Sequence, residues 1–441
     1  MKMLPAILAM LTLTGVSATH AQLNTRLTGR QLLGTESADV WTQGNLAYVA
    51  RGDDGMSMVD VTNPAAPVLR GTFAPVGCHM HDVEVVGNFA YMANHVFNNS
   101  GQPIVGLYIA EVSDPDNPVE AGRIEWGMGG GYHLGGSSYS IHIEARGPQR
   151  IAYIASNITS ELEVFDVTVP NAAVYLNTIL NPLWTYNSQP HEMVVRGNLL
   201  LTSWLQGGVT VDDVSNLAAP VRLAHAPTTP NYNYDAKFSA DGTHILTTEA
   251  GVSGGGIFKI RTLASLGAGT LPLVSTLTSP NATLFHNIAV QGQYAYVANF
   301  LDGLRILDIN NPAAPFIAGH YDTDPATTSG STSNGGIGVR VAGNNIFLSH
   351  GTGGLYIVDF VDTIAITKAE WSNRNNRLTV EATSTGAPHL TLTLAGYGTM
   401  TWSNSLGRYQ RVQNGVNSLP GSVTVTSSID GTASGSVRRV K

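Results

Sequence analysis

The feature that most constrains this chain is a short phrase that recurs along its length. Three clear copies read Gly-Met-Ser-Met-Val-Asp-Val-Thr-Asn-Pro-Ala-Ala-Pro, Gly-Val-Thr-Val-Asp-Asp-Val-Ser-Asn-Leu-Ala-Ala-Pro and Gly-Leu-Arg-Ile-Leu-Asp-Ile-Asn-Asn-Pro-Ala-Ala-Pro, at residues 55–67, 208–220 and 303–315. Four weaker copies begin at Gly106, Leu162, Gly256 and Gly354, which makes seven. Repeats of this kind predict a fold built from copies of one supersecondary unit.

Each copy follows a second pattern, an apolar strand with an aromatic residue that comes after a tight glycine turn. Leu46 to Ala50 and Tyr294 to Ala298 are examples, and a further strand precedes each turn. One unit is therefore four short strands, and successive units lie about 50 residues apart, which is typical of propeller blades. The sequence predicts an all-β chain with a seven-bladed β-propeller over residues 22–362.

The two ends of the repeat region predict how the ring is closed. The seventh unit stops after Phe360 without a fourth strand, whereas Leu23 to Leu33 reads as a fourth strand with no unit of its own. We expect this N-terminal strand to complete the seventh blade, which would remove an unpaired sheet edge.

The Gly-Leu-x-Ile-x-Asp-Ile-x-Asn-Pro phrases resemble those of the LVIVD-repeat β-propeller family of exported bacterial and archaeal proteins. The resemblance covers residues 23–362. It implies the propeller fold and the repeat type, and it implies no particular activity.

The segments outside the repeats predict export and a second domain. Residues 1–21 combine Lys2, an apolar stretch and small residues before a cleavage position, as a signal peptide does. Residues 364–441 contain short alternating strands without the repeat phrase, which predicts a small β-sandwich of the immunoglobulin-like kind. We expect an exported protein in the periplasm, at the cell surface or outside the cell.

The composition limits the kinds of partner that the chain is expected to bind. The chain has 23 basic and 31 acidic residues, a formal charge of −8, so a basic nucleic-acid surface is not expected. No stretch is long and apolar enough to predict a membrane span. The single cysteine, Cys78, cannot form an intrachain disulfide and is either a small buried residue or a soft ligand. We expect a monomer.

Histidine recurs where the first strand of each unit begins, the position expected to face the central channel. When the copies are registered on the first strand, this position holds Ala38 and Ile337 in the first and last units, and polar residues in the five between: His81, His142, His191, Asp235 and His286. These five residues are the candidate binding site at the mouth of the channel.

Two interpretations of this ring stay open. Imidazole and carboxylate could hold a divalent transition metal or calcium, with His142, His191 and His286 as catalytic candidates. Alternatively, each histidine bonds to the backbone of the neighbouring blade and is structural.

Acidic residues recur within the repeat phrase as well, just before its turn. They are Asp60, Glu111, Asp166, Asp213, Asp308 and Asp359. A carboxylate at such a place can accept backbone N–H bonds of the turn, which favours a structural role over calcium binding.

The resulting function prediction is a binding scaffold that uses its channel face for a ligand, a glycan or a cell-surface protein. The alternative is a metal-dependent enzyme of the polysaccharide lyase, hydrolase or oxidase type at the same ring, an analogy to other exported propellers that rests on fold alone.

Overall fold

Antiparallel strands make up nearly all of the regular structure. The computed structural model describes residues 22–95, 104–126, 138–156, 160–182, 188–228, 230–251, 255–279, 283–323 and 335–441. The expected signal peptide, residues 1–21, lies outside these ranges. Within them, the strand pairing gives seven four-stranded sheets between Thr25 and Phe360, and two further sheets after Ile364.

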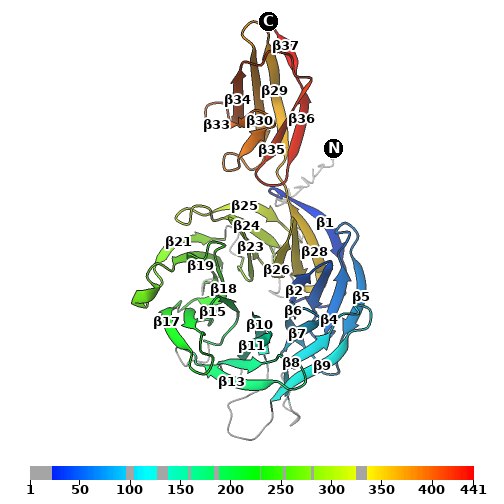
Figure 1. Cartoon of the computed structure of the whole chain (residues 1–441), viewed down its shortest axis with the longest axis vertical. Coiled ribbons are helices and arrows are strands. Elements are labelled where there is room, and N and C mark those ends of the chain that lie inside the picture. Colours follow the sequence, from blue (N-terminus) through cyan, green and yellow to red (C-terminus); the bar gives the residue numbers. More distant parts are fainter. Residues whose placement is uncertain are drawn as a thin grey trace, which may run out of the picture.

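The seven sheets are arranged around a common centre, and in each the first strand lies innermost (Figure 1). The first strands are β2 (Asp39–Gln43), β6 (Met80–Val86), β10 (Ser138–Arg146), β14 (Met193–Arg196), β18 (Tyr232–Phe238), β22 (Ile288–Gln291) and β26 (Gly336–Ala342). The second strands are β3 (Leu46–Ala50), β7 (Phe89–Asn94), β11 (Gln149–Ser156), β15 (Leu199–Ser203), β19 (His244–Ala250), β23 (Tyr294–Ala298) and β27 (Asn345–His350).

The repeat phrase forms the third strand of each sheet. These strands are β4 (Met56–Asp60), β8 (Ile104–Glu111), β12 (Leu162–Asp166), β16 (Val209–Asp213), β20 (Gly256–Thr262), β24 (Leu304–Asp308) and β28 (Gly354–Phe360). The outer strands are β5 (Val68–Phe73), β9 (Val119–Trp126), β13 (Val174–Ile179), β17 (Val221–Ala226), β21 (Leu273–Thr278), β25 (Phe316–Tyr321) and β1 (Thr25–Gln31). The short helices η1 (Leu266–Ala268) and η2 (Gly351–Gly353) lie in connections.

The N-terminal strand completes the last sheet, as predicted. β1 pairs antiparallel with β28, with Arg26 opposite Asp359 and Arg30 opposite Tyr356. In addition, β2 of the first sheet lies against β26 of the last. The ends of the repeat region are therefore neighbours in space.

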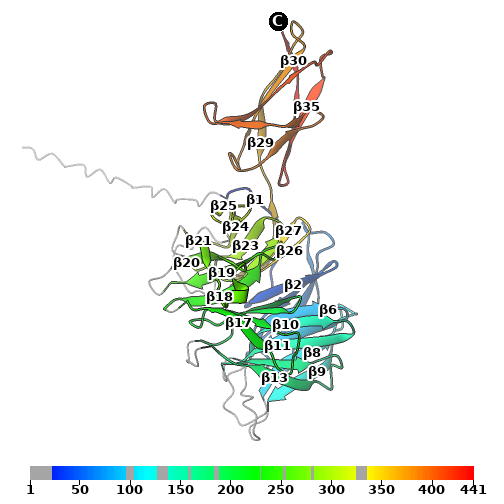
Figure 2. The same cartoon turned by 60° about the vertical axis from the view of Figure 1, so that its left-hand side comes forward.

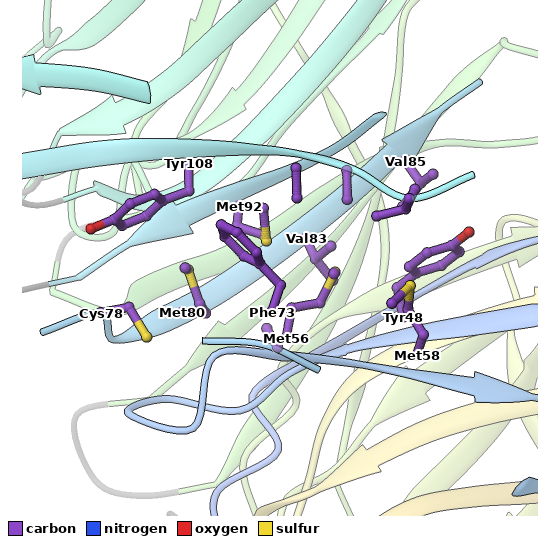
Figure 3. Close-up of a cluster of buried hydrophobic side chains, with 14 residues drawn as sticks. Tyr48, Met56, Met58, Phe73, Cys78, Met80, Val83, Val85, Met92 and Tyr108 are labelled. Carbon is purple, nitrogen blue, oxygen red and sulfur yellow. The ribbon is translucent and has the colours of Figure 1, made fainter. Parts of the chain in front are cut away.

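Apolar side chains fill the spaces between neighbouring sheets. Between the first two sheets, Met56 and Met58 of β4 meet Val83 of β6 and Met92 of β7 (Figure 3). Cys78 is buried in this cluster at 4% exposure, and burial raises the pKa of its thiol to about 11. Of the two roles expected for Cys78, the structure supports the small buried residue.

The carboxylates of the repeat phrase act as turn acceptors, as predicted. Five of the six accept the backbone N–H two residues further on: Asp60, Glu111, Asp166, Asp213 and Asp308. The sixth, Asp359, pairs with Arg26 at 2.6 Å.

Residues 364–441 form two sheets that share one apolar core. The strands are β29 (Ile364–Ser372), β30 (Arg377–Ser384), β31 (Leu392–Leu394), β32 (Gly398–Thr399), β33 (Thr401–Ser403), β34 (Arg408–Asn414), β35 (Ser422–Ser427), β36 (Thr432–Ser436) and β37 (Arg438–Val440). Their orders are β33-β34-β30-β29-β37 and β32-β31-β35-β36. This C-terminal module projects from the rim of the ring (Figure 2). No helix in the described ranges has the length and apolar character needed to cross a bilayer.

Candidate functional site

Strand pairing fixes which residues occupy the same place in each first strand. Equivalent residues of the first strands are those that pair with equivalent residues of the second strands. They are Val40, Val83, Ile141, Met193, Ala236, Ile288 and Val339. Two positions before them lie Ala38, His81, Tyr139, His191, Tyr234, His286 and Ile337. The predicted equivalence is correct at five of these places and wrong at His142 and Asp235.

Irregular strand starts are the physical background of the two errors. The register shifts at the start of β10 and β18, and equally at the start of β6 and β26, where the predicted residues happen to fall at the right place. Register follows the backbone pairing and not the side-chain type, so an alignment on polar residues slips where a strand bulges.

The corrected position forms an aromatic layer across the channel, consisting of His81, Tyr139, His191, Tyr234 and His286. Tyr139 lies between two imidazoles, with ring centroids 3.8 Å from His81 and 4.4 Å from His191. His191 lies 5.3 Å from His286, and Tyr234 lies 5.1 Å from each of them. Three of the predicted site residues are therefore brought together by the structure.

Two of the three imidazoles of this layer, those of His81 and His286, bond to the next sheet. His81 Nδ1 donates to the carbonyl of Tyr139 at 3.1 Å, and His286 Nδ1 donates to the carbonyl of Ile337 at 3.2 Å. These contacts match the structural alternative stated for the histidine ring. Burial, with nearby histidines, lowers the pKa of His81 to about 3, and burial also lowers the pKa of His191 and His286. All three imidazoles are therefore neutral at neutral pH.

A cavity of about 500 Å³ lies along the first strands, beyond the aromatic layer. It contains His142, whose Nδ1 pairs with Glu84 at 3.0 Å. Asp235 lies behind its wall, where it accepts bonds from Lys237 Nζ at 2.8 Å and from the amide of Ile288 at 2.7 Å. The polar side chains of the cavity are Asp39, Asp82, Glu84, His142, Glu192, Arg196, Lys237, Asn287 and Arg340.

Two carboxyl groups meet in this cavity. Asp39 of β2 and Asp82 of β6 hydrogen-bond to each other. Burial and the adjacent Asp82 raise the pKa of Asp39 well above its ordinary value, and burial raises that of Asp82 as well. Two carboxyl groups that hydrogen-bond must share a proton, so this pair carries less than its formal charge.

The cations of the cavity differ in how they are held. Lys237 lies between Asp235 at 2.8 Å and Glu192 at 3.7 Å; burial opposes its charge, but these two acids raise its pKa. Arg340 instead stacks on Trp41, with the guanidinium carbon 3.4 Å from the ring centroid.

Sequence reasoning missed most of these charged residues. Asp39, Glu84, Lys237 and Arg340 were not predicted as site residues. A signal was present: polar residues alternate along strands expected to be innermost, as in Asp82-Val83-Glu84 and Asp235-Ala236-Lys237. An interior strand with charges at every second position indicates a polar channel and not a packed core.

The described part of the chain gives no metal-binding arrangement of the predicted kind. Within those ranges, no three His, Cys, Asp or Glu side chains are grouped so that they could hold an ion. His142 and Asp235 lie outside the aromatic layer that contains His81, His191 and His286. The five residues therefore do not form one ring.

The class of fold is a β-propeller. The β-propeller domain of Cps50 (Swd1) from Myceliophteria thermophila matches with a TM-score of 0.55 at 11% identity, over 77% of this chain and 99% of that domain. The computationally designed protein Ika8 matches with a TM-score of 0.48 at 9% identity, over 77% of this chain and all of that one.

Within that class, the chain carries LVIVD repeats. The model of the LVIVD repeat matches at residues 34–74, 77–125 and 285–323. Two of these segments contain the clear copies of the repeat phrase at residues 55–67 and 303–315. A search of the curated proteins found no match by sequence.

Proposed function

We propose that this chain is an exported binding scaffold, a seven-bladed β-propeller over residues 22–362 that takes a small polar ligand in its central cavity. Residues 1–21 would direct export. Residues 364–441 would form an immunoglobulin-like β-sandwich. The pairing of β1 with β28 and the contact of β2 with β26 support a closed ring.

The cavity on the channel axis is the observation that carries this proposal. Its volume of about 500 Å³ falls within the range of small-molecule sites, roughly 300–1,000 Å³. Its walls come from several first strands, which are paired with the second strands and, at Asp82, Glu84 and Asp235, bonded to the next sheet. A site built on rigid strands keeps its shape without the ligand and so loses little entropy on binding.

The polar lining decides the chemistry of the ligand. Charged side chains such as Glu84, Lys237 and Arg340 line the cavity beside apolar ones such as Ile288. Water can satisfy these groups, and so can a ligand rich in hydroxyl, amine or carboxyl groups. A sugar unit of a glycan or another small polar compound fits better than an apolar one.

A single variant that fills the cavity tests the proposal. Ala289 of β22 lines the cavity, and Ala65 lies exposed in an outer turn. The full-length chain would be screened on glycan arrays and against a small polar-compound library by thermal shift. We expect Ala289→Leu to abolish the binding found for the wild type and Ala65→Leu to retain it. Binding that both variants retain would place the ligand elsewhere.

The metal-dependent enzyme is the alternative. One observation favours acid–base chemistry: Glu84 orients His142 in the cavity, as carboxylates orient catalytic or metal-bound histidines. Metal analysis of protein purified without an affinity tag separates the two functions. Stoichiometric metal that is lost in His191→Ala or His142→Ala would support the enzyme.

A further inference from the structure

Several buried acids of the propeller are matched to cations. Several acids of low exposure each bond to a basic side chain within 3.0 Å: Glu84 to His142, Asp212 to Arg222, Asp235 to Lys237, Glu249 to Lys259 and Asp302 to Arg305. This pattern follows from the large cost of burying a charge without a partner.

Like the buried Glu163, the Asp39–Asp82 pair has no such cation, and unlike Glu163 it lines the cavity. Asp82 Oδ2 accepts bonds from the Ser140 hydroxyl at 2.7 Å and from the amide of Ile141 at 2.8 Å. Asp39 and Asp82 otherwise bond to each other. Among the described residues, no lysine, arginine or histidine forms an ion pair with either carboxyl group.

Arg340 lines the same cavity but is not the cation partner of the carboxyl pair. Arg340 faces the cavity close enough to feel Glu84, Asp39 and Asp82 electrostatically, yet its guanidinium is stacked on Trp41. Within the described ranges it forms no ion pair. Arg340 therefore leaves the carboxyl pair open to the cavity and keeps its own N–H donors available there.

We propose that the cavity binds a small organic cation whose primary ammonium group donates hydrogen bonds to Asp39 and Asp82. This inference rests on the proposed function, since it assigns a ligand class to the same cavity. The chain itself contains the comparable arrangement, because the Lys237 ammonium lies between Asp235 at 2.8 Å and Glu192 at 3.7 Å. A ligand that also carries hydroxyl or carboxyl groups could accept bonds from Arg340.

Binding of such a ligand releases a proton. In the free protein the pair holds one proton between its two carboxyl groups. When the ammonium donates to both, the pair becomes two carboxylates and the proton leaves to solvent. The charged and titratable groups that face the pair are Glu84 (β6), His142 (β10), Glu192 (before β14), Asp235 and Lys237 (β18), and Arg340 (β26). Affinity should therefore rise with pH while the pair remains protonated.

Calorimetry with matched probes tests the inference on the full chain. The amines are 1,5-diaminopentane and glucosamine, and the neutral counterparts are 1,5-pentanediol and glucose. We expect at least one amine to bind with release of about one proton, counted in buffers of different ionisation enthalpy. Its neutral counterpart should bind roughly 10- to 100-fold more weakly, as for the loss of a charge-assisted hydrogen bond.

Isosteric variants assign the effect to the carboxyl pair. Asp82→Asn and Asp39→Asn should each weaken amine binding by a similar factor and abolish the proton release. Asp39→Asn keeps the bonds of Asp82 to Ser140 and Ile141, so it carries the test if Asp82→Asn does not fold. Asp60→Asn, in an exposed turn, is the control and should bind as the wild type does.

The remaining outcomes overturn the inference. If neither amine binds, or if an amine and its neutral counterpart bind equally, the cavity does not select an ammonium group. Binding of glucose that Ala289→Leu abolishes would then retain the proposed scaffold while refuting the ligand class. Proton release that persists in Asp39→Asn would also refute it.

Discussion

The amide of Ile288 donates a 2.7 Å hydrogen bond to the carboxylate of Asp235, although the two residues belong to neighbouring sheets. In the same way, Asp82 and Glu84 of the second sheet accept hydrogen bonds at 2.8 Å from the amides of Ile141 and Ile143 in the third sheet. Side chains of one first strand thus fix the next first strand. Asp82 and Glu84 therefore hold the sheets together and line the cavity at the same time.

Loss of the Asp235 carboxylate should destabilise the ring strongly. Asp235 is fully buried and bonds to both Lys237 and Ile288, so Asp235→Asn leaves a buried ammonium with only the more distant Glu192. We expect a loss of roughly 3–5 kcal/mol in the free energy of unfolding, measured by chemical denaturation. The double variant Asp235→Asn/Lys237→Met should recover part of it.

The matched control is Asp213→Asn, which changes the same side chain in an outer turn where it accepts one amide bond. We expect a loss within about 1 kcal/mol there. Equal losses in the two single variants would mean that the channel carboxylate has no special part in holding the sheets together.

Close packing between an outer strand and the next turn predicts a second sensitive position. A Cβ added at Gly122 of β9 would lie 1.9 Å from the carbonyl oxygen of Pro170, which belongs to the following sheet. Gly29 of β1 meets Pro64 in the same way at 2.0 Å, across the junction of the last and first sheets. These contacts are with backbone atoms, which cannot move aside as the end of a flexible side chain can.

We therefore expect Gly122→Ala to lower the free energy of unfolding by about 1–3 kcal/mol, the usual cost of overpacking. Gly267→Ala, where an added Cβ meets nothing within 4 Å, should stay within about 0.5 kcal/mol of the wild type. Thermal melts of the three proteins measure this, and an unchanged Gly122→Ala would show that the turn moves aside.

Local patterns predicted the strands, the pairing of β1 with β28 and the turn carboxylates, because each depends on residues within one unit or on an unpaired edge. The cavity could not be predicted in the same way. Arg340 meets Trp41, and Asp39 meets Asp82, only because the last sheet returns to the first and neighbouring first strands align at the centre. The bulges that shift the register of β10 and β18 cannot be recognised from the types of residue in these strands.

A fall in pH should destabilise the propeller, because His191 of the aromatic layer is buried in its neutral form. Burial keeps the pKa of His191 well below its ordinary value of about 6.5, so below that pH the unfolded chain takes up a proton that the folded chain does not. The contribution of His191 to stability is therefore complete above pH 6.5 and falls as the pH drops, by at most about 1.4 kcal/mol per pH unit.

His191→Phe keeps a ring in the layer and removes the titration. Denaturation curves at pH 8, 6.5, 5.5 and 4.5 should show the stability of the wild type falling relative to that of the variant below pH 6.5, with a constant difference above it. A difference that does not change with pH would contradict burial of a neutral imidazole at this place.

The last prediction concerns the C-terminal module, whose residues reach into the propeller core. Leu390 is 4% exposed and packs in one cluster with Phe360 of β28 and Tyr296 of β23. Leu390→Ala should therefore cost about 2–5 kcal/mol, the range for a buried leucine. Leu406→Ala changes a leucine of the same module that is 44% exposed, and it should cost less than about 0.5 kcal/mol. Hydrogen exchange would locate the loss: amides of β27 and β28 should exchange faster in Leu390→Ala alone. Unchanged exchange there would mean that the module folds on its own and adds nothing to the last sheet.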